Sequence, residues 1–111
     1  MDTCLFCKII EKEISSKIRF ENDEFIAFDD INPKAKTHIL LVPKRHIQSV
    51  VTLEESDYEM IGKLVLTAQA VAKTAGLQSY RLVFNSGSEA GQAVDHIHLH
   101  ILGGNKLGNI A

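Results

Sequence analysis

The sequence has no long apolar run and few cysteines. No stretch of its 111 residues approaches the length of a transmembrane span. The first ten residues carry an acid at Asp2 and no apolar core, so no signal peptide is expected. We therefore expect a cytoplasmic protein with no membrane partner. The only two cysteines, Cys4 and Cys7, are not expected to form a lasting structural disulfide in that compartment.

The sequence also lacks an excess of basic residues. Twelve Lys and Arg against fourteen Asp and Glu give a formal net charge of −2, which argues against binding of a nucleic-acid polymer. Small anionic ligands remain compatible with a local site. There is no repeat, low-complexity tract or linker, so residues 1–111 are expected to form one domain. A chain of this length gains stability from dimerisation.

The first half of the chain predicts a short helix and three strands. Phe6, Ile9 and Ile10 indicate a helical turn near the N-terminus. Residues 18–21 and 25–28 are β-prone runs on either side of Asn22-Asp23, which predicts a hairpin. Residues 29–33 are expected to be a loop that ends at Pro33, and residues 38–42 a third strand that ends before Pro43.

The second half predicts one long helix and two further strands. Thr52 and Glu55 fit a capping box, and Gly76 is placed to end a helix over residues 53–75. Its apolar stripe has helical spacing: Ile61, Leu64, Val65, Ala68, Ala72 and Ala75. Strands are predicted over 80–85 and 94–102, with a glycine-containing loop over 86–91. The expected class is α+β, a mainly antiparallel five-stranded sheet covered by the long helix, plus the short N-terminal helix.

The last predicted strand carries three histidines on one face. Alternation places His96, His98 and His100 on one side, and three apolar residues (97, 99 and 101) on the other. Neighbouring histidines would lie ~6–7 Å apart, which suits one imidazole meeting a phosphate and another flanking it. A solvated polar face would rarely be histidine at every position. A single ion bound by all three is disfavoured because they spread over ~13 Å, although one of them could bind a metal.

The surroundings point to histidine as a nucleophile. The chain has no serine-centred nucleophile motif and no Walker-type loop. A neutral imidazole can attack at one nitrogen while an acceptor holds the proton on the other. The loop over 85–93 could direct backbone N–H groups at phosphate oxygens, although an ordinary connection has a similar composition.

Together these segments resemble the histidine triad (HIT) superfamily. The motif His-φ-His-φ-His-φ-φ, where φ is apolar, is complete over residues 96–102. Further segments resemble the histidine triad nucleotide-binding (Hint) branch: Cys4-Leu5-Phe6-Cys7-Lys8-Ile9-Ile10, Phe28-Asp29-Asp30-Ile31-Asn32-Pro33, Thr37-His38-Ile39-Leu40-Leu41-Val42-Pro43-Lys44 and Asn85-Ser86-Gly87-Ser88. The resemblance covers nearly the whole chain and implies the HIT-like fold.

The resemblance also implies a role for each histidine. His98 would be the nucleophile that forms a covalent nucleotidyl-histidine. His96 and His38 would form a hydrogen-bond chain behind it, and His100 would contact the phosphate oxygens. By the residues alone, His38 could equally be a structural histidine.

The remaining site residues implied by the resemblance bind the nucleotide. Asp30 would hold the ribose hydroxyls, although it is also an ordinary turn former. The base would lie in an apolar slot of Phe6, Ile9, Phe28 and Ile31, and Asn85, Gly91, Gln92 and Ala93 would line the phosphate. Composition alone would place the four apolar residues in the core.

The implied activity is hydrolysis of purine nucleoside phosphoramidates by a homodimer whose sheets join, with no cofactor required for catalysis. The ligands would be a purine nucleoside monophosphate and its phosphoramidate or anhydride derivatives. Hydrolysis of dinucleoside polyphosphates, or a nucleotide-binding regulatory module with incidental turnover, are the alternatives. Many relatives have a serine at the position of Ala93, so this chain lacks a donor contributing on the order of 1–3 kcal/mol to the leaving group.

The pair Cys4-x-x-Cys7 has three interpretations. A redox pair normally follows a strand, and none can precede residue 4. Free buried thiols are the second interpretation. The third is half of a tetrahedral zinc site, which the resemblance completes with His46 and His96. Such a zinc would be structural, and one nitrogen of His96 could bind it while the other orients a neighbour.

Overall fold

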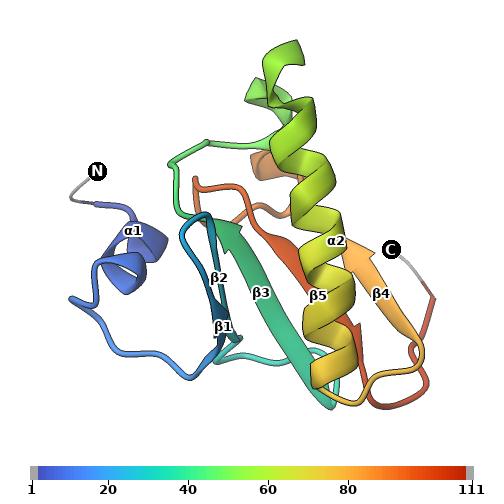
Figure 1. Ribbon diagram of the computed structural model, residues 1–111. Coiled ribbons are helices and arrows are strands. Elements are labelled where there is room, and N and C mark those ends of the chain that lie inside the picture. Colours follow the sequence, from blue (N-terminus) through green and yellow to red (C-terminus); the bar gives the residue numbers. More distant parts are fainter. Residues whose placement is uncertain (1–2, 110–111) are drawn as a thin grey trace.

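A five-stranded antiparallel sheet forms the frame of the fold (Figure 1). The computed structural model describes residues 3–109. Its strands are β1 (Ile18–Glu21), β2 (Phe25–Asp29), β3 (Thr37–Pro43), β4 (Tyr80–Val83) and β5 (Leu99–Gly103). They lie in the order β1-β2-β3-β5-β4, and every adjacent pair is antiparallel. The predicted α+β class and five-stranded sheet are confirmed.

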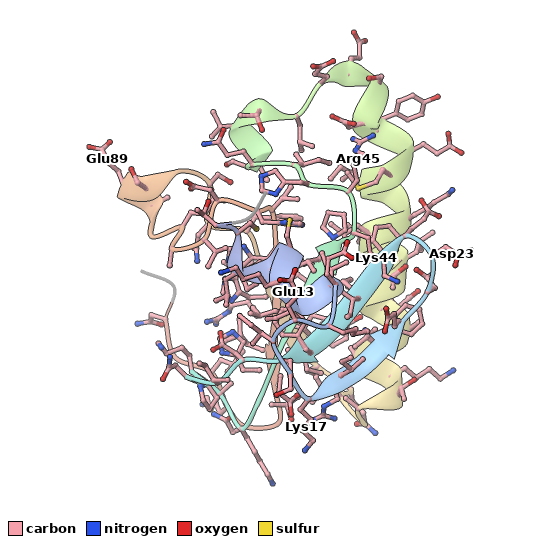
Figure 2. The ribbon with its side chains drawn as sticks, turned by 90° about the vertical axis from the view of Figure 1, so that its left-hand side faces the viewer. Glu13, Lys17, Asp23, Lys44, Arg45 and Glu89 are labelled. Carbon is pink, nitrogen blue, oxygen red and sulfur yellow. The ribbon has the colours of Figure 1, made fainter. Side chains whose placement is uncertain are left out.

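The two helices cover opposite faces of this sheet. Helix α2 (Tyr58–Thr74) crosses one face, and α1 (Leu5–Ile10) lies on the other. Figure 2, viewed from the α1 side, shows α1 in front of the sheet with Glu13 just beyond it. Because successive side chains of a strand point to opposite faces, β2 and β3 are buried on both sides.

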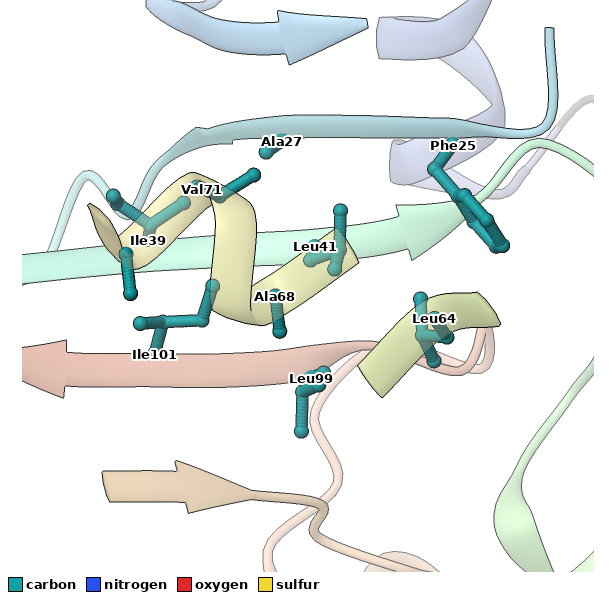
Figure 3. Packing of buried hydrophobic residues seen from close by; sticks show 10 residues of the cluster. Phe25, Ala27, Ile39, Leu41, Leu64, Ala68, Val71, Leu99 and Ile101 are labelled. Carbon is teal, nitrogen blue, oxygen red and sulfur yellow. The ribbon is translucent and has the colours of Figure 1, made fainter. Parts of the chain in front are cut away.

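The α2 face holds the larger hydrophobic cluster (Figure 3). Alternate residues of β2, β3 and β5 pack there against the buried stripe of α2, which consists of Leu64, Ala68, Val71 and Ala72. Leu64 is completely buried, so truncating it to alanine would cost about 2–5 kcal/mol of the free energy of unfolding. On the opposite face, Ile26, Phe28, Leu40 and Val42 pack against Phe6 and Ile9 of α1. The α1 helix is therefore fixed to the sheet by its apolar side chains.

The last strand is shorter than the sequence predicts. It begins at Leu99 rather than at residue 94. Leu41 pairs with Leu99, and in that register Pro43 would lie opposite Ile97. Proline has no N–H to donate to the ladder, and Ile97 donates its N–H to the carbonyl of Ile47 instead. Residues 94–98 therefore form an irregular segment, and only His100 of the three histidines lies within the strand.

The long helix also begins later than predicted. Residues 50–52 and 55–57 are short 3₁₀ turns, and α2 starts at Tyr58 rather than near residue 53. The predicted cap of Thr52 and Glu55 is wrong, because Thr52 closes a capping box with Ser49 and Asp57 accepts the N–H of Glu54. Val65, at the margin of the predicted stripe, is 42% exposed.

The turn predictions are confirmed. The Asn22 side chain accepts the N–H groups of Glu24 and Phe25 between β1 and β2. Gly76 follows α2 with a φ of 79°, a left-handed conformation that favours glycine. Within residues 3–109 no helix is both long enough and apolar enough to cross a membrane.

Candidate active site

A cavity of about 590 Å³ lies on the α1 face of the sheet. It is enclosed by α1 with the segment that follows, by β2 and the loop after it, by β3, and by the chain from the end of β4 through the segment before β5 into β5 itself. His98 and His100 both line it, with ring centroids 5.0 Å apart. His96 is completely buried and does not line it. The irregular segment before β5 thus separates the three histidines that an unbroken strand would align.

His98 has a defined tautomer. Its Nδ1–H donates to the carbonyl oxygen of His96 over 2.7 Å. A carbonyl can only accept, so the proton of the neutral ring is on Nδ1 and the lone pair is on Nε2. The His98 side chain lines the cavity, so it offers this lone pair to a ligand. An imidazole in this state can act as a nucleophile.

His100 has the opposite tautomer. The backbone N–H of Lys34 donates to Nδ1 of His38 over 3.0 Å, so the proton of His38 is on Nε2. That nitrogen lies 2.9 Å from Nδ1 of His100 and donates to it. The remaining proton of His100 is therefore on Nε2, which lies 3.4 Å from the amide nitrogen Nδ2 of Asn85; both groups are donors, so the Nε2–H is not taken up by Asn85. His100 can donate a hydrogen bond to a ligand oxygen, and the two cavity histidines are chemically distinct.

Burial keeps these rings neutral. It lowers the pKa of His98, because charging the ring would remove hydration, while the hydrogen bond to His96 acts in the opposite direction. Burial, with smaller contributions from His98 and His38, lowers the pKa of His100 to about 4. Burial also lowers the pKa of His38, against the opposing effect of Asp30. Near neutral pH the cavity therefore presents one imidazole lone pair and one imidazole N–H.

The hydrogen-bond partners differ from those the resemblance implies. His38 was expected behind His98 but pairs with His100. His96 supports His98 through its backbone carbonyl, while its own ring donates from Nε2 to the carbonyl of Pro43. Carbonyl partners of this kind depend on the local backbone path, which a motif does not specify.

The apolar side of the cavity is formed by α1 and β2. Phe6 packs edge-on against Phe28 and against the His98 ring, with centroids 5.5 and 4.9 Å apart. Ile9 and Ile31 also line the cavity, and Ile31 is 88% exposed at its rim. Together these side chains form a slot for a flat apolar group.

The polar side is formed by Asp30 and the loop after β4. An Asp30 oxygen accepts the N–H of Asn32, and its other oxygen lies 3.4 Å from Nε2 of His38. Asn85, Gly91 and Ala93 line the cavity next to the histidines. These groups can accept ribose hydroxyls and meet phosphate oxygens.

Gln92 does not line this cavity. Its side-chain amide donates to the carbonyls of Gln48 and Val94, and its oxygen accepts the N–H of Gly87. The side chain holds the loop in place, and Gly87 and Gly91 have left-handed φ values of 96° and 91° there. Gln92 therefore stabilises the loop that forms the cavity wall without lining the cavity itself.

The structure adds cavity residues that the sequence did not single out. They are Leu5, Ile14, Ser15, Ser16, Asp29, Asn32, Lys34, Leu40, Val83, Val94 and Leu102. Of these, only Lys34 could have been proposed from the sequence, as a basic residue four positions after Asp30. The others belong to elements whose packing was not predicted.

A second cluster of functional side chains lies behind His96. Nδ1 of His96 is 3.5 Å from Sγ of Cys4, 3.6 Å from Sγ of Cys7 and 3.2 Å from Nδ1 of His46, and Cys7 Sγ is 3.4 Å from that same nitrogen of His46. A tetrahedral zinc, with bonds of about 2.0 Å to nitrogen and 2.3 Å to sulfur, separates its ligand atoms by about 3.3–3.8 Å. The four residues fit a zinc ion, and the hydrogen bond from His96 Nε2 to Pro43 leaves Nδ1 free to bind it.

Comparison with known proteins places the chain among histidine triad proteins. The family model described as "Scavenger mRNA decapping enzyme C-term binding" matches residues 3–109. A 14 kDa zinc-binding protein of Zea mays is 44% identical over 106 residues, which cover 93% of this chain and 83% of that protein.

Two solved structures have the same fold. A HIT family hydrolase from Legionella pneumophila superposes with a TM-score of 0.92 and is 44% identical, with 96% of each chain covered. A histidine triad protein from Clostridium difficile superposes with a TM-score of 0.94 and is 40% identical, with 100% of this chain and 97% of the other covered.

Proposed function

Since this chain belongs to the histidine triad family, we propose that it is a nucleotide hydrolase in which His98 attacks phosphorus. The observation that carries this proposal is the pair of opposite tautomers in one cavity. His98 offers a lone pair at Nε2, and His100 offers an N–H. The proposed substrates are purine nucleoside phosphoramidates, with the base in the apolar slot lined by Phe6, Ile9, Phe28 and Ile31 and the ribose at Asp30.

The proposed reaction has two displacements. In the first, Nε2 of His98 forms a bond to phosphorus, the bond from phosphorus to the amine breaks, and the amine takes up a proton from water. His100 donates its Nε2–H to a phosphate oxygen. The His98 ring becomes positive, and the His96 carbonyl stabilises it through the Nδ1–H.

In the second displacement, water attacks the nucleotidyl-histidine. The bond from phosphorus to Nε2 breaks, its electron pair returns to His98, and the water proton passes to solvent. The products are the nucleoside monophosphate and the regenerated neutral imidazole. This division into two steps is the usual advantage of a covalent intermediate.

We also propose that Cys4, Cys7, His46 and His96 hold a structural zinc. The zinc would link α1 to the segment that carries His98. None of these four ligands lines the cavity of about 590 Å³, so no electrophilic role at phosphorus is assigned to the ion.

The proposed assembly is a homodimer joined through the sheets. Strand β4 forms one edge of the sheet, and Leu82 on it is 36% exposed. An antiparallel edge can pair with a second copy. Sedimentation equilibrium tests this proposal, and a monomer at high concentration would contradict it.

A paired assay tests the proposed function. Wild type and His98→Ala are incubated with an adenosine phosphoramidate and, separately, with a diadenosine polyphosphate. We expect turnover of the phosphoramidate by the wild type and a loss of at least about 10⁴-fold in the variant. Nucleotide binding by the variant controls for folding. Unchanged activity in His98→Ala would reject the nucleophile, and binding without turnover of either substrate would indicate a binding module.

A further inference from the structure

A second cavity adjoins the candidate active site. Its volume is about 470 Å³, and it is lined by Thr3, Cys4, Leu5, His46, Ala93, Val94 and Asp95. Three of these residues, Leu5, Ala93 and Val94, also line the first cavity. The two cavities therefore share one wall, formed by the start of α1 and the segment before His96.

The far end of a substrate would emerge toward this shared wall. On the proposed function, the nucleoside occupies the side of the first cavity formed by Phe28 and Asp30. The phosphate then lies between His98, His100 and the loop. In-line displacement places the leaving group opposite the attacking nitrogen. The side opposite His98 would then be the wall at Ala93, which lines both cavities and carries only a methyl group.

The described residues give the second cavity a negative charge. Asp95 is exposed and is the only acidic side chain among the described residues that line it. No side chain of residues 3–109 forms an ion pair with Asp95. A zinc ion held by two thiolates and two neutral imidazoles has no net charge, so the metal cluster would not offset Asp95.

We infer that the second cavity is a subsite for the leaving group and that Asp95 makes it favour a cationic group. The inference rests on the proposed function and adds to it the class of amine released. A flexible tail with an ammonium group at its end fits this site. A carboxylate at the same place would meet the charge of Asp95 and be disfavoured.

Three adenosine phosphoramidates that differ only in the end of the tail test the inference. Their amines are hexamethylenediamine, hexylamine and aminohexanoate, which end in ammonium, methyl and carboxylate. For the wild type we expect kcat/KM to be about two- to fivefold higher for the ammonium tail than for the methyl tail, as for an exposed ion pair. The carboxylate tail should be the poorest substrate, and added salt should reduce the differences.

Variants of Asp95 assign the effect to this residue. Asp95→Asn should bring the ammonium-to-methyl ratio close to one while leaving kcat/KM for the methyl tail unchanged, which also shows that the variant is folded. Asp95→Lys should make the carboxylate tail the better of the two charged substrates. Glu89→Gln is the matched control, because Glu89 lies on the 3₁₀ turn Ser88–Ala90 and points away from the molecule (Figure 2). It should leave the ratio as in the wild type.

The outcomes separate the two proposals. Hydrolysis of all three substrates at equal rates by the wild type would contradict the subsite while leaving the proposed function intact. A ratio that persists in Asp95→Asn, or that Glu89→Gln removes equally, would also contradict it. If the wild type hydrolyses none of the three, the proposed function is rejected and the subsite is rejected with it.

Discussion

Nδ1 of His98 donates to the carbonyl oxygen of His96 over 2.7 Å, so adjacent members of the histidine motif have different tasks. The backbone of His96 fixes the tautomer of His98. The ring of His96 faces Cys4, Cys7 and His46 instead. One residue therefore connects the proposed nucleophile with the proposed metal site, and the predictions below follow from this arrangement.

The hydrogen bond from His38 to His100 predicts graded effects. His100→Leu removes the N–H directed into the cavity, and we expect kcat to fall about 10²–10³-fold, as for loss of one donor at a reacting oxyanion. His38→Leu leaves the His100 ring in place but removes the hydrogen bond that holds its proton on Nε2. The fall in kcat should therefore be smaller than for His100→Leu. Steady-state kinetics of the two variants measures this order. Equal losses, or no loss in His38→Leu, would contradict the role of this hydrogen bond in fixing the His100 tautomer.

The neutral state of His100 predicts how stability depends on pH. In the unfolded chain the ring takes up a proton near its ordinary pKa of 6.5, whereas in the fold its pKa is about 4. Between these values the unfolded state binds more protons, so the free energy of unfolding decreases as the pH falls from about 6.5 toward 4. Urea unfolding near pH 7.5 and near pH 5 measures the decrease. His100→Asn should show a smaller decrease than the wild type, and an equal one would contradict the assignment.

The Cys4, Cys7, His46 and His96 cluster predicts one zinc ion per chain. Elemental analysis of protein purified without chelator should find it in the wild type and not in Cys4→Ser/Cys7→Ser. Because the ion would link α1 to the segment before β5, its removal by a chelator should lower Tm in the wild type alone. A metal-free wild type would reject the site.

Because Ala93 has no hydroxyl, we expect the enzyme to give little assistance to a strongly basic leaving amine. Ala93→Ser adds a hydroxyl beside the phosphate, and one such donor contributes about 1–3 kcal/mol when it meets developing charge. We expect kcat to rise on the order of tenfold for an alkylamine, which leaves as a strong base. An arylamine, which needs less assistance, should gain less. Equal gains for both amines would place the hydroxyl away from the leaving group.

Elements defined by local chemistry were predictable from the sequence. Asn22 closes a hairpin and Gly76 ends a helix because their side chains, or the lack of one, act within a few residues. The confirmed class and strand number follow from such signals.

Features that depend on distant partners were not predictable in the same way. Residues 94–98 do not extend β5 because Pro43, far away in the sequence, interrupts the ladder on β3. His38 pairs with His100 because their strands are neighbours, and no spacing within one segment specifies that contact. Gln92 was placed in the cavity wall, but the backbone groups it binds belong to Gln48, Gly87 and Val94.

The stereochemical course at phosphorus tests the central claim most directly. An adenosine phosphoramidate made chiral at phosphorus with sulfur is hydrolysed in ¹⁸O-labelled water, and the configuration of the product is determined. Each in-line displacement inverts phosphorus, so attack by His98 followed by water predicts overall retention. Overall inversion would show that water attacks phosphorus in a single displacement and would contradict a covalent nucleotidyl-His98.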